Sequence, residues 1–199
     1  MESFKYKVIK KAVSYELANF CFNYILLKRD AVNYMYKNNI LPDNSLHGTW
    51  EDKQVPGSYS IYGDPVMETL LMKVLPVMKD KTGMNLVPTY SYARVYETRA
   101  ELLRHKDRPS CEISTTINLG GEPWPIYLDP TGKQGQAGVK VDLEPGDMLI
   151  YSGCDLEHWR EEFKGKNCGQ VFLHYNKSSS KTAKENYLDK RPILGAPGS

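Results

Sequence analysis

The stretch that decides the fold runs from Tyr90 to Leu119, YSYARVYETRAELLRHKDRPSCEISTTINL. It contains two runs in which consecutive side chains alternate in character, as they do in β-strands with two different faces. The larger side chains of the first run are Tyr90, Tyr92, Arg94 and Tyr96. The second run begins at Cys111, and His105 and Asp107 form a His-x-Asp pair between the two runs. The stretch therefore predicts two strands that flank a pair of residues able to bind a metal.

More short strands are expected downstream, separated by turn residues such as Gly, Pro and Asp. They span residues 124–128, 139–143, 148–151, 157–161 and 168–176. Two of the intervening segments are a Gly-rich hairpin tip at 129–138 and a turn at 145–147. Many short strands with turn signals predict an all-β sandwich or barrel.

The residues before the first strand have a helical pattern. Ser14 is a suitable N-cap for a long first helix, and Asp64 followed by Pro65 is a strong start for a second. Gly83 fits the left-handed position that ends a helix. Pro76 lies inside the second span, where we expect it to kink or split the helix. These helices predict a layer that supports the β-structure.

The remaining segments are less regular. Residues 42–63 are rich in Gly, Pro, Ser and Asn, and a loop of this length in a compact domain is usually functional, so we expect a lid. The tail at 177–199 is polar, and we expect poor order at 195–199. The predicted organisation is one domain, with helical support at 1–85, a catalytic β-core at 86–176 and this tail.

Composition narrows the class of protein. The chain has 199 residues, 41% hydrophobic and 25% charged, as in ordinary globular domains. A formal charge of +2 gives no support for nucleic-acid binding, and no apolar run is long enough to span a membrane. The N-terminus lacks the apolar core of a signal peptide, and the four cysteines form no Cys-x-x-Cys pair. We therefore expect a cytoplasmic protein with reduced thiols and neither a membrane nor a nucleic-acid partner.

A second histidine, His158, follows a Gly-Asp turn and a buried strand. Two imidazoles and one carboxylate with open positions form the facial triad that suits non-haem Fe(II). His105 and Asp107 point to the same side of an extended backbone, and His158 would join them from a later strand. The alternatives are two structural histidines and an Asp107 that only caps the turn after it.

Residues 88–176 resemble the double-stranded β-helix core, a jelly-roll of cupin type, of the Fe(II)/2-oxoglutarate-dependent dioxygenases. The nearest similarity is to the prolyl 4-hydroxylase-like branch, which has bacterial and phage members. The residues that carry the resemblance are Tyr96, His105, Asp107, the turn at 144–147, His158 and the strand at 170–175. The resemblance implies that His105, Asp107 and His158 bind Fe(II) and that Tyr96 hydrogen-bonds 2-oxoglutarate. It also implies dioxygen as a substrate and ascorbate as an accessory reductant.

The sequence departs from the family pattern at the cation that holds the distal carboxylate of 2-oxoglutarate. Members usually carry Lys or Arg some ten residues after the second histidine, where this chain has no cation. Arg160 shares the parity of His158 on a strand, and its planar fork can bind a carboxylate through two hydrogen bonds. We prefer Arg160, with Lys166 and Arg94 as alternatives.

The resemblance implies hydroxylation of a substrate C–H bond with release of succinate and CO2. Asp107 favours hydroxylation, because related halogenases lack this carboxylate. The substrate is a prolyl peptide or protein, another side chain or a small molecule, and the residues expected to line its pocket are Tyr90, Tyr92, Arg94 and Trp124. For the first three, a solvent-facing strand surface is the alternative. The competing functions are a cupin-like metal-binding isomerase and a non-catalytic binding barrel.

Overall fold

The computed structural model describes residues 4–41 and 45–196. The helices are α1 (Tyr15–Lys37), α2 (Pro65–Thr82) and α3 (Ala183–Asn186), with short 3₁₀ turns η1 (Ser45–His47), η2 (Pro109–Cys111) and η3 (Tyr187–Lys190). The strands are β1 (Tyr6–Ile9), β2 (Tyr59–Tyr62), β3 (Leu86–Glu97), β4 (Leu102–His105), β5 (Ile113–Gly121), β6 (Ile126–Leu128), β7 (Val139–Val141), β8 (Met148–Tyr151), β9 (His158–Arg160) and β10 (Asn167–Lys177).

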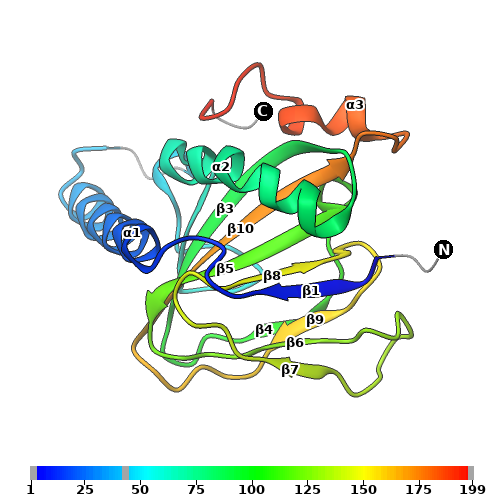
Figure 1. Ribbon diagram of the computed structural model, residues 1–199. Helices are drawn as coiled ribbons and strands as arrows, with labels where there is room; N and C mark the ends of the chain where they lie inside the picture. The colour runs from blue at the N-terminus through cyan, green and yellow to red at the C-terminus, as the bar shows by residue number, and fades with distance from the viewer. Residues whose placement is uncertain (1–3, 42–44, 197–199) are drawn as a thin grey trace.

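Two antiparallel sheets form the β-structure, as Figure 1 shows. The larger has the strand order β1-β8-β5-β10-β3-β2, and the smaller has the order β4-β9-β6-β7. Strands that are distant in sequence are neighbours in both sheets, which is the pattern of a jelly-roll. The predicted fold class, mainly β with N-terminal helices around a double-stranded β-helix, is confirmed.

The helices cover the outer face of the larger sheet (Figure 1). Their buried faces join the largest hydrophobic cluster, in which Ala93 and Val95 of β3 pack with Leu71 and Val74 of α2. The intervening residues of β3, among them Arg94, point to the opposite face of the sheet, because side chains alternate along a strand. One face of β3 therefore builds the core, and the other faces the space between the two sheets.

Local signals explain where the helices begin and end. Ser14 caps α1 by accepting a hydrogen bond from the N–H of Leu17, and Asp64 caps α2 ahead of Pro65. Gly83 ends α2 with a φ of 70°. Pro76 does not split α2 as expected. Proline has no N–H, so Pro76 cannot donate to the carbonyl of Met72 four residues earlier. Met72 is 45% exposed, so solvent can hydrate that carbonyl.

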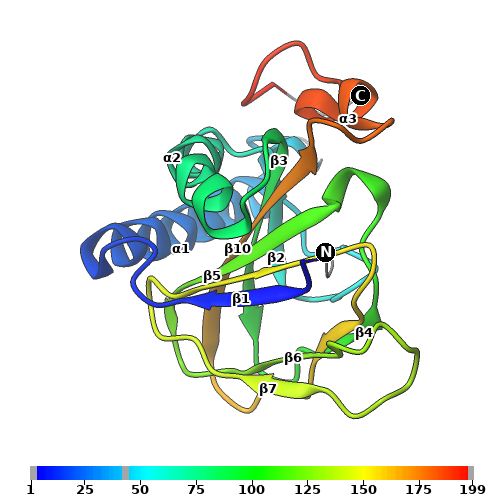
Figure 2. The ribbon, with the colours of Figure 1, turned by 45° about the vertical axis from the view of Figure 1, so that its right-hand side comes forward.

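The segment after β10 is more ordered than its polar composition predicts. It forms α3 and η3, which lie near the start of β3 (Figure 2). The N–H of Gly195 donates to the buried Glu68. The expectation of poor order at 195–199 is therefore wrong for Gly195, and residues 197–199 lie outside the described residues, as do 42–44 of the expected lid loop. Neither long helix in the described ranges is apolar enough to cross a membrane.

Candidate metal and co-substrate site

A cavity of about 250 Å³ lies between the two sheets. Side chains from β3, β4, β8, β9 and β10 line it, together with residues of the segment between α1 and β2. Its lining residues are Asp52, Gln54, Tyr90, Tyr92, Arg94, Tyr96, Leu102, His105, Lys106, Asp107, Arg108, Cys111, Tyr151, His158, Phe172 and His174. The three expected metal ligands thus share one cavity with most of the expected substrate-pocket residues.

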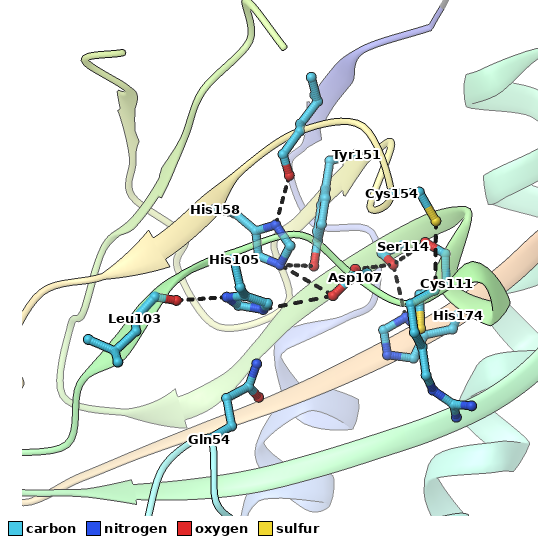
Figure 3. A network of polar contacts seen from close by, with 12 residues as sticks. Gln54, Leu103, His105, Asp107, Cys111, Ser114, Tyr151, Cys154, His158 and His174 are labelled. Atoms are coloured by element: carbon cyan, nitrogen blue, oxygen red, sulfur yellow. Dashed lines mark hydrogen bonds and ion pairs between the residues drawn. The ribbon is translucent and has the colours of Figure 1, made fainter. Parts of the chain in front are cut away.

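Strand pairing brings the three expected ligands together. His105 at the end of β4 is the register partner of His158 at the start of β9, and their rings lie 4.2 Å apart. Asp107 follows β4 and turns its Oδ1 toward both rings, 3.8 Å from His105 Nε2 and 3.5 Å from His158 Nε2. Figure 3 shows the three side chains converging.

Main-chain carbonyls orient both imidazoles (Figure 3). His105 Nδ1 lies 2.7 Å from the carbonyl oxygen of Leu103, and His158 Nδ1 lies 3.1 Å from that of Leu156. Each Nδ1 donates to its carbonyl, so each Nε2 carries the lone pair that a metal requires. The two lone pairs therefore face the carboxylate of Asp107.

The other carboxylate oxygen of Asp107, Oδ2, accepts a hydrogen bond that fixes the orientation of the carboxylate. Ser114 Oγ donates to Asp107 Oδ2 at 2.8 Å, and His174 Nδ1 lies 2.9 Å from the same Oγ. Burial alone would raise the pKa of Asp107, but the interactions with His158, His174 and Ser114 hold it well below its usual range. Asp107 is therefore ionised and presents Oδ1 to the metal position.

Burial and the nearby ring of His158 lower the pKa of His105. A neutral imidazole is the form that binds a metal. Metal bonds of about 2 Å allow one ion to reach donor atoms at these separations. The donor set of two imidazoles and one carboxylate, with the cavity on its open side, fits Fe(II).

A second group of potential ligands shares Asp107 and adds Cys111 and His174. Burial raises the pKa of Cys111, and its thiol lies 3.0 Å from the hydroxyl of Tyr90. A thiol that stays protonated is a poor metal ligand. The group of His105, Asp107 and His158 is therefore the better candidate.

Arg160 carries an unpaired positive charge beside this site. Its side chain is buried, and its only hydrogen bond in the described part of the chain runs from Nη1 to the carbonyl of Trp124. Nε and Nη2, which form one edge of the guanidinium, have no partner among the described residues. Its register partner is Leu102, a residue of the cavity wall. A buried guanidinium without a carboxylate is costly, so this edge is suited to the carboxylate of a ligand.

The other two expected cations are placed differently. Arg94 lines the cavity and forms an ion pair of 3.0 Å with Asp52, and it donates to the hydroxyl of Tyr96 at 3.3 Å. Lys166 is exposed and lines a separate surface pocket with Glu97. Arg94 is thus neutralised within the protein, and Lys166 lies outside the cavity.

The expected substrate residues divide into two groups. Tyr90 and Tyr92 line the cavity along β3, in phase with Tyr96. Trp124 packs edge-on behind Tyr96, with ring centroids 4.7 Å apart, and the guanidinium of Arg160 lies over its ring. Trp124 therefore belongs to the wall around Arg160 and does not line the cavity itself.

Sequence reasoning missed several residues of the site, and strand parity could have found the serine that holds Asp107. Ser114 and Thr116 alternate with the apolar Ile113 and Ile117, which indicates a polar inward face of β5. Asp52 carries no such signal, because it lies in an irregular segment far from its partner Arg94 in the sequence. The other cavity residues missed include Gln54, Arg108, Cys111, Tyr151 and His174.

Several solved structures share this fold at low sequence identity. A prolyl-4-hydroxylase from Pseudomonas putida superposes with a TM-score of 0.60 at 14% identity, over 88% of this chain and 94% of that one. SnoN, a non-haem alpha-ketoglutarate-dependent epimerase from nogalamycin biosynthesis, gives 0.65 at 11% identity, over 98% and 88%. EctD from S. alaskensis with bound Fe gives 0.61 at 18% identity, over 96% and 79%.

The fold is that of the Fe(II)- and 2-oxoglutarate-dependent oxygenases, as the resemblance of residues 88–176 predicted. Comparison of the sequence with protein-family models and with curated proteins gives no match. The structures that share the fold include a hydroxylase and an epimerase. Fold similarity therefore leaves the reaction to be argued from the site.

Proposed function

We propose that this protein is an Fe(II)- and 2-oxoglutarate-dependent oxygenase that hydroxylates a C–H bond and releases succinate and CO2. The observation that carries this proposal is the convergence of His105 Nε2, His158 Nε2 and Asp107 Oδ1 at one wall of a cavity. Three fixed ligands with an open side are the arrangement that oxygen activation requires. The intact carboxylate of Asp107 supports hydroxylation over halogenation.

The residues of this chain have distinct roles in the proposal. His105, Asp107 and His158 hold the metal, and Ser114 keeps the carboxylate of Asp107 in place. Bound iron, with 2-oxoglutarate and dioxygen, supplies the oxidising chemistry. The position of the cavity between the two sheets limits the access of water to the reacting groups.

The unpaired edge of Arg160 supports a role in binding the distal carboxylate of 2-oxoglutarate. Tyr96 lines the cavity, where its hydroxyl accepts from Arg94 and its ring packs against Trp124. The register partner of Arg160, Leu102, lines the cavity, which supports a place for the distal carboxylate at this edge. Lys166, on the outer surface, is the weaker candidate.

The class of substrate is argued from the cavity. Tyr90 and Tyr92 provide aromatic walls next to the metal position, which suit a flat or cyclic group such as a prolyl ring in a peptide or protein. A small molecule would use the same walls. We place the activity in the cytoplasm, with ascorbate as an accessory reductant.

The direct test is release of succinate from 2-oxoglutarate by the protein with Fe(II) and ascorbate in air. We expect succinate to form slowly without a substrate and faster with a matching prolyl peptide or small molecule. The Asp107→Ala variant is the control, because it removes one ligand. Succinate formation that is absent, or that is equal in the variant, would favour the isomerase or the non-catalytic binding barrel.

A further inference from the structure

A carboxylate of the C-terminal segment binds an arginine at the cavity wall. Asp189 in η3 forms two contacts with Arg108, Oδ2 with Nη2 at 2.7 Å and Oδ1 with Nη1 at 3.2 Å. Tyr62 also donates to Asp189 Oδ2 at 2.7 Å. This fork geometry is the way in which arginine recognises a free carboxylate group.

Arg108 is part of the candidate active site. It directly follows the expected ligand Asp107 and lines the cavity. Its guanidinium lies 4.5 Å from the ring centroid of Tyr90, which stacks on Tyr62 at 5.1 Å. An aromatic surface beneath a guanidinium fixes the direction of its hydrogen bonds. Asp189 therefore places a carboxylate at the edge of the cavity in a defined orientation.

The backbone that carries Asp189 is strained. Leu188, Asp189 and Lys190 have φ angles of 50°, 53° and 65°, and none of them is glycine. Residues other than glycine rarely adopt this backbone conformation. Each residue that does so lowers the stability of the folded protein. The buried ion pair between Arg191 and Glu68 anchors the segment just beyond this turn. The turn can therefore relax if Asp189 leaves Arg108, while the anchor stays in place.

We propose that Arg108 is the receptor for a carboxylate group of the substrate, and that Asp189 occupies this receptor when no substrate is bound. This inference rests on the proposed function and narrows its substrate to acids, such as a free amino acid or a peptide with a carboxylate next to the reacting group. An incoming carboxylate displaces Asp189, and release of the strained turn offsets part of the lost ion pair.

Arg108 is the cation best placed for this role. Arg94 is buried against Asp52, and Arg160, which is absent from the cavity lining, is the proposed partner of 2-oxoglutarate. The side chain of Arg108 is 51% exposed, so a substrate can reach it from solvent. Its carboxylate partner also comes from a segment that belongs to neither of the two sheets.

The test measures binding of a small acid and its neutral analogue, N-acetylglycine and N-acetylglycinamide. The holoprotein is loaded with Fe(II) and saturated with 2-oxoglutarate without oxygen, so that no turnover occurs, and binding is followed by calorimetry. Asp189→Asn removes the competing charge, and Asn tolerates the left-handed backbone. We expect N-acetylglycine to bind this variant about tenfold more tightly than the wild type, given the usual strength of charged hydrogen bonds.

Three controls define the outcome. Arg108→Gln should abolish binding of the acid without changing the affinity for 2-oxoglutarate. Asp142→Asn, which removes an exposed carboxylate paired with Lys140, should behave as the wild type does. In the wild type, N-acetylglycine should speed amide exchange at 187–191. Equal binding of acid and amide, or an unchanged affinity in Asp189→Asn, would overturn the proposal. Because no turnover is involved, these results stand apart from the succinate test.

Discussion

At the scale of single residues, orientation of the donor atoms defines the candidate metal site. His105 and His158 donate through Nδ1 to main-chain carbonyls, so Nε2 of each ring faces Asp107. Ser114 occupies one oxygen of Asp107 and leaves the other toward the rings. Each ligand therefore offers one defined atom to a single ion.

The first prediction concerns the ligand set. His158→Ala should reduce iron binding from one ion per chain to none at micromolar metal, because the two remaining ligands bind a metal weakly. Metal content after anaerobic loading and desalting is the measurement. His47→Ala is the matched control, since His47 does not line the cavity. Full iron content in His158→Ala would refute the assignment.

The second prediction distinguishes the candidate cations for 2-oxoglutarate. Arg160→Leu removes the unpaired edge and should raise the concentration of 2-oxoglutarate needed for half-maximal succinate release by about a hundredfold, as for a lost bidentate charge pair. Lys166→Leu should leave this concentration unchanged. The reverse result would assign the carboxylate to Lys166.

At the scale of structural elements, β3 connects the helical core with the cavity. Its apolar residues Ala93 and Val95 pack under α2, while Tyr92 and Arg94 face the cavity and hold Asp52. The segment before β2 is thus fastened to the cavity wall through Asp52, which also accepts hydrogen bonds from two backbone N–H groups of its own turn. The lid expected at 42–63 stays a prediction.

The third prediction tests this fastening. Asp52→Asn should raise the amide exchange rate of residues 49–58 about tenfold, because the ion pair with Arg94 is lost while the local turn can still form. Hydrogen exchange followed by mass spectrometry provides the measurement. Glu51→Gln, at the exposed neighbouring position, should leave the rate unchanged. Equal rates in the two variants would show that Asp52 does not hold the segment.

At the scale of the whole molecule, a buried ion pair joins the C-terminal segment to the helical layer. Glu68 of α2 and Arg191 are both about 1% exposed at their side chains. Glu68 also accepts the N–H of Gly195. The segment that carries Asp189 is therefore fixed to the domain at one point and contacts the cavity wall at another.

The fourth prediction concerns this ion pair. Glu68→Ala should lower the free energy of unfolding by about 3–5 kcal/mol, because it leaves the guanidinium of Arg191 buried without a carboxylate. Urea unfolding is the measurement. Glu68→Ala combined with Arg191→Met should recover much of the loss. A single variant as stable as the wild type would contradict the role of the pair.

The fifth prediction concerns pH. Burial lowers the pKa of His174 to about 4, against about 6.5 in an unfolded chain. Between these values the unfolded chain binds a proton that the folded protein does not, so stability falls as pH falls through this window. The loss reaches about 3 kcal/mol at its lower end.

Urea unfolding of the metal-free protein between pH 7 and pH 4 measures this effect. His174→Gln removes the titrating group, so its stability should depend less steeply on pH over the same range. Identical slopes for the two proteins would show that His174 titrates normally.

The sequence predicts the parts of the structure that depend on local pattern. Alternation along β3 predicts which side chains face the cavity, and parity predicts that His158 and Arg160 are both buried, with Trp159 between them less so. Caps at Ser14 and Asp64 predict where the helices begin. These features follow from neighbouring residues, so one sequence is sufficient.

The contacts of Asp52 and Asp189 could not be predicted in this way. Each lies in an irregular segment, and its arginine partner belongs to a distant part of the chain. Ion pairs of this kind leave no periodic trace, because charge complementarity does not depend on spacing in sequence. The polar composition of the tail likewise gives no indication of the ion pair between Arg191 and Glu68.

The main-chain carbonyls of Leu103 and Leu156, which orient the two imidazoles, have a consequence for evolution. Every amino acid carries the same carbonyl, so side-chain replacement at these two positions leaves the alignment of the rings intact. A lineage can then exchange nearly all of the flanking sequence and still assemble the three donors. Detecting distant homologues of this protein will therefore depend on comparing backbone structures, because only a few residues have to be conserved.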